Sequence, residues 1–151
     1  MRGGVVFVTL NVPGSNNNRG FDGASDEEAR ARDEANLAWL AAAAALARDH
    51  RHRGLVVIFH ANPFVAERTG VYDAYLEKLA AIAADLARPV LLVHGDTHRQ
   101  RADRPFKDSA GRPIANLQRL ESYGSPFLGW VKVTVDGAGP QLFSFEARGR
   151  D

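Results

Sequence analysis

Two apolar runs decide the fold of this chain: residues 54–63, GLVVIFHANP, and residues 89–98, PVLLVHGDTH. Both contain an unbroken series of Val, Leu, Ile or Phe that leads into a histidine. Short continuous apolar runs rich in β-branched residues are typical of strands that are buried on both faces, as in a parallel sheet. The sequence therefore predicts two buried strands, at Leu55 to His60 and at Val90 to Val93.

The segments around these two strands extend the alternation of strand and helix. Val5 to Val12 is a further β-branched run, and residues 72–87 repeat apolar side chains at helical spacing until Pro89 closes the helix. Residues 26–50 predict a long helix with acids in its first turns and basic residues at its end. This order of strands and helices predicts an α/β fold.

Each predicted helix carries an apolar stripe that should face the sheet. Ser25, with Glu28 three residues later, matches a capping box and places the start of the first helix. We expect Trp39 on the first helix and Leu79 on the second to be core residues. The stripe of the first helix consists of Trp39, Leu40, Ala43, Leu46 and Ala47.

After Arg99 the sequence changes to short alternating segments, which predict antiparallel strands. They are Leu117 to Tyr123, Trp130 to Val135 and Gln141 to Phe145. Gly and Pro residues between 136 and 140 indicate that the last two strands form a hairpin. The complete prediction is a single domain over residues 1–151, with β-α-β-α-β followed by an antiparallel β meander.

Composition narrows the classes of function. Apolar residues make up 45% and charged residues 25%, which is typical of a globular protein, and the net charge of +1 gives no specific signal for nucleic acid or membranes. Cysteine is absent, so a metal would be held by His, Asp, Glu or Asn. No apolar run approaches the roughly 20 residues of a membrane helix, and Met1 to Gly4 leads directly into a strand. As written, the chain is expected to be soluble and cytoplasmic.

Histidine and aspartate side chains follow the predicted strands, at the edge where parallel sheets place their ligand sites. His60 ends one strand, and His94, Asp96 and His98 follow the next. If the chain stays extended, the last three point to one side, because side chains alternate along a strand. Imidazole and carboxylate together favour a transition metal such as Zn, Fe, Mn or Ni. The spacing therefore predicts a site for divalent metal ions.

Each of these residues also has an ordinary structural interpretation. A single His at a strand end is usually solvated or hydrogen-bonded, and Asp96 after Gly95 fits a turn aspartate. Arg99 and Arg101 are candidates for binding substrate phosphate, and a solvated basic loop is the alternative. Neither G-x-S-x-G nor a glycine-rich phosphate loop occurs, which excludes serine-elbow hydrolases and that mode of nucleotide binding.

The two apolar runs resemble the last two metal motifs of calcineurin-like metallophosphoesterases. In that family one strand ends in a ligand His and the next in Gly-His-x-His, which here is Gly95-Asp96-Thr97-His98. The resemblance covers Val5 to Phe145 and implies a β-sandwich flanked by helices. It further implies that His60 and Asp96 bind one metal ion and His98 a second, with a phosphate ester as substrate.

The family's Gly-Asp-x-x-Asp and Gly-Asn-His motifs do not occur in this sequence. The resemblance therefore implies the carboxyl-terminal part of such a domain, with half of a two-metal site that is open to solvent on one side. The expected function is hydrolysis of phosphomonoesters or phosphodiesters by metal-activated water. The alternative is a non-catalytic fragment or subunit that binds one metal weakly, or that associates with itself or a complementing chain through an open sheet edge. In either case His60 and Asp96 should be the closest pair of ligands.

Overall fold

The computed structural model describes residues 3–65, 70–135 and 141–149. Its main sheet has five strands in the order β1-β2-β3-β5-β4. Four of them are parallel: β1 (Val5–Thr9), β2 (Gly54–Ile58), β3 (Val90–His94) and β5 (Leu117–Glu121). The short strand β4 (Arg101–Asp103) is antiparallel to β5. The predicted α/β class is therefore confirmed, with a mixed sheet.

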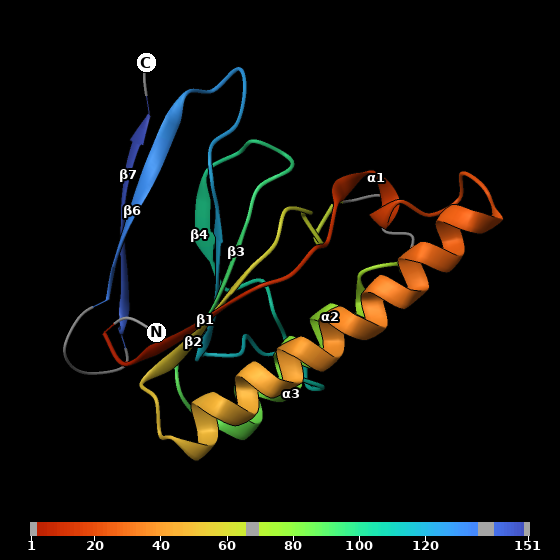
Figure 1. The fold of residues 1–151 in the computed structure, drawn as a ribbon. Helices are drawn as coiled ribbons and strands as arrows, with labels where there is room; N and C mark the ends of the chain where they lie inside the picture. Colours follow the sequence, from red (N-terminus) through yellow and green to blue (C-terminus); the bar gives the residue numbers. More distant parts are fainter. Residues whose placement is uncertain (1–2, 66–69, 136–140, 150–151) are drawn as a thin grey trace.

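Three layers make up the molecule (Figure 1). The helices α2 (Gly23–Asp49) and α3 (Asp73–Leu86) pack on one face of the sheet, over a core that includes Leu55, Leu79 and Leu92. The hairpin of β6 (Gly129–Val135) and β7 (Phe143–Gly149) contributes to a second core on the other face. The predicted pairing of the last two strands is confirmed, and the turn predicted at 136–140 lies outside the described residues.

The segment Leu117–Glu121 corrects the predicted antiparallel meander. It pairs in parallel with β3 and is buried along most of its length, so it belongs to the main sheet. Its polar residues suggested a strand with one solvated face, but Arg119 and Glu121 are 4% and 0% exposed. Each forms an ion pair, with Asp103 and Arg101 of β4 respectively, and such pairing permits charged residues to be buried.

The start of α2 differs from the predicted capping box at Ser25 and Glu28. The helix begins at Gly23, and the Asp22 side chain accepts a hydrogen bond of 2.7 Å from the backbone N–H of Ser25. The Ser25 hydroxyl oxygen in turn accepts one of 3.1 Å from the backbone N–H of Asp22. Ser25 is thus the third residue of the helix rather than its cap, because the preceding Asp22 already fills that role.

The predicted apolar stripe is partly wrong, because Trp39 is 61% exposed and Leu46 is 39% exposed. The buried face of α2 instead follows Leu40, Ala43, Ala44 and Ala47. Trp39 and Leu46, seven positions apart, lie on one flank of the helix, outside this buried face. The corresponding prediction for Leu79 of α3 is confirmed, since it is fully buried. Among the described residues, no helix is long and apolar enough to cross a membrane.

Candidate functional site

The loops that follow β1, β2 and β3 meet at the carboxyl edge of the parallel strands, where ligand sites form in such sheets. Strands β2 and β3 are neighbours, and the backbone N–H of Gly95 donates to the carbonyl of His60 over 3.0 Å. His60 Nε2 consequently lies 3.9 Å from Asp96 Oδ1. The predicted convergence of these two side chains is confirmed, although they come from separate loops.

The Asp96 carboxylate is held from two sides. Its Oδ2 accepts a hydrogen bond of 2.9 Å from the backbone N–H of Asn62, which leaves Oδ1 on the side of His60. Gly14, in the loop after β1, lies so close that a Cβ at this position would be 2.8 Å from Oδ1. The carboxylate is therefore packed against main chain on one side and open toward His60 on the other.

The loop after β1 contains an unusual backbone turn, labelled α1 (Gly14–Asn17). Four consecutive residues, 15–18, have positive φ angles between 50° and 60°. Asn adopts this left-handed conformation more readily than other residues with a Cβ, which explains the run of three asparagines. Asn17 anchors the turn: it is fully buried, and its amide donates to both carboxylate oxygens of Asp33 over 2.9 and 3.0 Å.

These anchoring residues escaped sequence analysis, because the partners Asn17 and Asp33 lie 16 positions apart in the sequence and carry no metal motif. Tyr75 of α3 completes the anchor by donating its hydroxyl to Asp33 Oδ1 over 2.6 Å. Burial and the hydrogen bond to Asp33 raise the pKa of Tyr75 well above the ordinary tyrosine value, so its phenol stays protonated at neutral pH.

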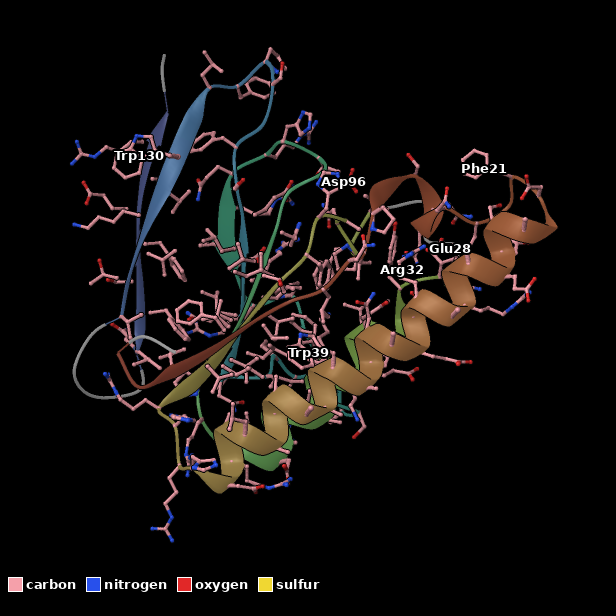
Figure 2. The ribbon with its side chains drawn as sticks, in the orientation of Figure 1. Phe21, Glu28, Arg32, Trp39, Asp96 and Trp130 are labelled. Carbon is pink, nitrogen blue, oxygen red and sulfur yellow. The ribbon has the colours of Figure 1, made fainter. Side chains whose placement is uncertain are left out.

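An open pocket of about 660 Å³ lies between this turn, the first half of α2 and the His60–Asp96 pair. Figure 2 labels Phe21, Glu28, Arg32 and Asp96 around it. Its lining consists of Asn11, Pro13, Gly14, Ser15, Asn18, Phe21, Glu28, Arg32, His60 and Asp96. The His60 side chain is 63% exposed, in line with the expectation that the site is open to solvent on one side.

Among the described residues that line this pocket, Arg32 is the only arginine or lysine, and its hydrogen-bonding capacity is used up. Its Nε and one Nη donate to the Glu28 carboxylate, over 2.7 and 3.1 Å. The remaining N–H groups donate to Asn11 and Asn17. Since a guanidinium has five N–H donors, Arg32 has none left for a ligand.

His94 and His98 do not share a face with Asp96, which corrects the prediction from alternation. The chain leaves the extended conformation after β3, with φ angles of 76° at Asp96 and 61° at His98. His94 is 2% exposed and tilts against the ring of Phe64, with 6.3 Å between the ring centres. The His98 ring instead packs against Gly124, and its Nδ1 contacts the carbonyl of Ser125. Burial lowers the pKa of His94, which favours its neutral form.

The two predicted substrate-binding arginines lie outside the pocket lining. Arg101 Nε is 3.0 Å from Glu121 Oε2, an ion pair between a partly exposed guanidinium and a fully buried carboxylate. The backbone N–H of Arg99 donates to Glu121 Oε1 over 3.2 Å, and its side chain is exposed. Contact of either residue with substrate stays a prediction.

The His60–Asp96 pair fits one metal ion by distance and by donor type. Two ligand bonds of about 2.0–2.2 Å to one ion span at most about 4.4 Å, so donors 3.9 Å apart are within reach of it, and a tetrahedral ion would draw them to about 3.4 Å. Hydrogen bonding of the far carboxylate oxygen, here by Asn62, is typical of ligating carboxylates. Among the described residues no three His, Cys, Asp or Glu side chains gather into a metal-binding group, so the metal role of His98 stays a prediction.

Comparison with known proteins adds no relative to this geometry: no family model, no curated protein and no solved structure matches the chain.

Proposed function

We propose that this chain contributes to a metal-dependent phosphoesterase that hydrolyses phosphomonoesters or phosphodiesters. The observation that carries the proposal is the approach of His60 and Asp96 to 3.9 Å at the carboxyl edge of parallel strands, beside an open pocket. These two residues would hold one divalent ion, and the resemblance adds His98 as a ligand of a second. A bound ion supplies a water molecule activated for attack on phosphorus and stabilises the charge that develops there.

The charges around the pocket support a requirement for a metal ion. Glu28 and Asp96 are acidic lining residues, and Arg32 donates all its N–H groups to protein acceptors. A phosphate ester is an anion, and it would meet no available Arg or Lys side chain on this lining. A divalent ion on His60 and Asp96 would provide the missing positive charge at the place where the phosphate must bind.

The roles of the two side chains follow from their hydrogen bonds. Asp96 keeps Oδ1 directed to the ion because Oδ2 is occupied by the Asn62 N–H group. His60, which is largely exposed, turns its Nε2 toward Asp96 and would offer that nitrogen as a neutral ligand.

Metal titration of matched variants tests the proposal directly. We expect wild-type protein to bind Mn²⁺ or Zn²⁺ in isothermal titration calorimetry. His60→Ala and Asp96→Asn should weaken binding by more than the roughly 10- to 100-fold typical of residues behind the ligands. His50→Ala removes an exposed histidine at the far end of α2 and serves as the control. His98→Ala should weaken binding less than either substitution at the paired ligands.

Activity supplies the second arm of the test. Phosphate or nitrophenol release from p-nitrophenyl phosphate and bis(p-nitrophenyl) phosphate should depend on added Mn²⁺ and be lost in Asp96→Asn. If the wild-type protein and His50→Ala bind no better than the two ligand variants, the metal site is wrong. Metal binding at His60 and Asp96 without release from either ester would instead refute phosphoesterase activity of this chain by itself.

A specific feature favours a second candidate function, that of a subunit which associates through its sheet edge. Strand β1 pairs with β2 and has no other strand partner among the described residues. Its Phe7 is 45% exposed, so this edge strand presents an apolar side chain to a partner. Light scattering after size exclusion should then show a dimer or larger assembly that Phe7→Glu dissociates. A monomer at all concentrations would refute self-association through β1.

A further inference from the structure

The fully buried carboxylate of Glu121 lies at the end of β5, outside the pocket, and the proposed function assigns it no role. It is adjacent to the loop that carries Asp96, because β5 pairs with β3 and Glu121 is in register with His94. Its Oε1 accepts hydrogen bonds from the Thr97 hydroxyl and from the Arg99 backbone N–H. Two residues of the loop after β3 are thus tied to it, and Arg101 of β4 forms an ion pair with Oε2.

A chain of hydrogen bonds continues from Glu121 to the candidate metal site. Thr97 Oγ1 accepts a hydrogen bond of 2.7 Å from the Asn62 side-chain amide. Asn62 is 4% exposed and belongs to the other loop of the site, two residues after His60. Its backbone N–H donates to Asp96 Oδ2 over 2.9 Å. The buried chain therefore links Glu121, Thr97 and Asn62 to the carboxylate that faces His60.

The chemistry of Glu121 fixes the direction of this chain. An ionised carboxylate only accepts hydrogen bonds, so the Thr97 hydroxyl must donate to it and has its lone pairs free for Asn62. The Asn62 amide nitrogen must then face Thr97, which directs its carbonyl oxygen to the backbone N–H of Phe64, 2.9 Å away. The two contacts together fix the orientation of the Asn62 side-chain amide.

We propose that Glu121 and Thr97 are positioning residues that hold Asp96 in the orientation needed to share an ion with His60, a role that rests on the proposed metal site. The backbone bond from Gly95 to His60 brings the loops together but does not orient the carboxylate. Asp96 also has a φ angle of 76°, a conformation that non-glycine residues keep only when their surroundings enforce it. Thr97 holds the side chain of Asn62, and the backbone N–H of Asn62 donates to Asp96 Oδ2. Asp96 Oδ1 is therefore the oxygen that faces His60.

The test uses Thr97→Val, which keeps the shape of the side chain and removes its hydroxyl, with Thr97→Ser as the conservative variant that restores it. Thr134→Val makes the same substitution on β6, where the side chain is exposed, and is the control. Two quantities are measured: the exchange rate of the Asn62 backbone amide by NMR without metal, and Mn²⁺ affinity by calorimetry. We expect Thr97→Val to accelerate exchange and to weaken Mn²⁺ binding by roughly 10- to 100-fold, with Thr97→Ser and Thr134→Val unchanged.

Glu121→Gln provides a second variant if Thr97→Val does not fold. Gln keeps a side-chain oxygen that can accept from Thr97, but a neutral acceptor forms a weaker hydrogen bond than a carboxylate and the ion pair with Arg101 is lost, so Asn62 exchange should be faster than in wild type. Exchange as slow as in wild type would overturn the role of Glu121. Asn62 exchange in Thr97→Val as slow as in wild type would overturn the positioning role. Faster exchange with unchanged Mn²⁺ affinity would overturn its link to the site. The wild-type protein could bind no Mn²⁺ while Thr97→Val still accelerates exchange of the Asn62 backbone amide. In that case the proposed function fails and the positioning of Asp96 stands.

Discussion

Replacing Gly14 by Ala should disturb the candidate site without replacing any proposed ligand. The added Cβ would lie 2.8 Å from Asp96 Oδ1, 3.1 Å from its Cγ and 3.2 Å from its Oδ2. A side-chain carbon does not come this close to a carboxylate unless one of the two groups shifts. The carboxylate cannot move freely, because its Oδ2 accepts a hydrogen bond from the backbone N–H of Asn62. The backbone at Gly14 does not require glycine, since its φ angle is not positive.

The expected magnitude follows from two opposing effects. Loss of the hydrogen bond to the charged carboxylate costs about 1.5–3 kcal/mol. The smaller conformational freedom of Ala in the unfolded chain offsets about 0.4–1 kcal/mol of that. Gly14→Ala should therefore lower the free energy of unfolding by about 0.5–2.6 kcal/mol, move the NMR signal of the Asn62 amide and weaken metal binding. Urea denaturation measures the first effect, and ¹⁵N spectra measure the second.

Gly23→Ala is the matched control for this experiment. Gly23 is the first residue of α2, and a Cβ there would meet nothing within 4 Å. The same substitution should leave the Asn62 signal in place and should leave stability unchanged or raise it by up to about 1 kcal/mol. If Gly14→Ala is as stable as Gly23→Ala and the Asn62 signal does not move, the close packing of Gly14 against Asp96 is wrong.

Two further predictions test the core and the anchor of the turn. Leu40→Ala should lower the free energy of unfolding by about 2–5 kcal/mol and Trp39→Ala by less than about 1 kcal/mol, because only Leu40 is buried. Equal losses in urea melts would refute the observed buried face of α2. Because the pKa of Tyr75 is raised in the folded state, its protonated phenol contributes stability below pH ~10, the ordinary tyrosine pKa. This contribution should be lost as the pH rises above that value. Tyr75→Phe, which also loses the hydrogen bond to Asp33, should show a smaller fall in melting temperature between pH ~8 and ~11 than wild type.

The predicted strands at β1, β2 and β3 were confirmed because a strand buried on both faces is a continuous apolar run, which is a local pattern. The same holds for the two helices, whose observed bounds, Gly23–Asp49 and Asp73–Leu86, differ from prediction by a few residues. Adjacent parallel strands also brought His60 and Asp96 together as predicted. These features depend on short windows of sequence and on general rules of sheet topology.

The sequence-based predictions were wrong where a residue distant in the chain decides whether a side chain is buried or which way it points. The polar side chains of β5 suggested a solvated strand, but ion pairs with β4 permit their burial. The exposure of Trp39 depends on which face of α2 packs on the sheet, and that face contains Leu40, Ala43 and Ala47 instead. Alternation failed for His94 and His98 because the chain bends at Asp96, where hydrogen bonding by Asn62 from another loop supports a positive φ angle.

The sequence by itself therefore determined the order of strands and helices, the edge of the sheet at which the site forms, and its two paired side chains. Only the tertiary structure decided which way those side chains point and what holds them. The orientation of Asp96 depends on Gly14 from the loop after β1, on Asn62 from the loop after β2 and on Glu121 of β5. Each of these contacts joins residues far apart in the chain, and hydrophobic periodicity contains no information about such hydrogen bonds.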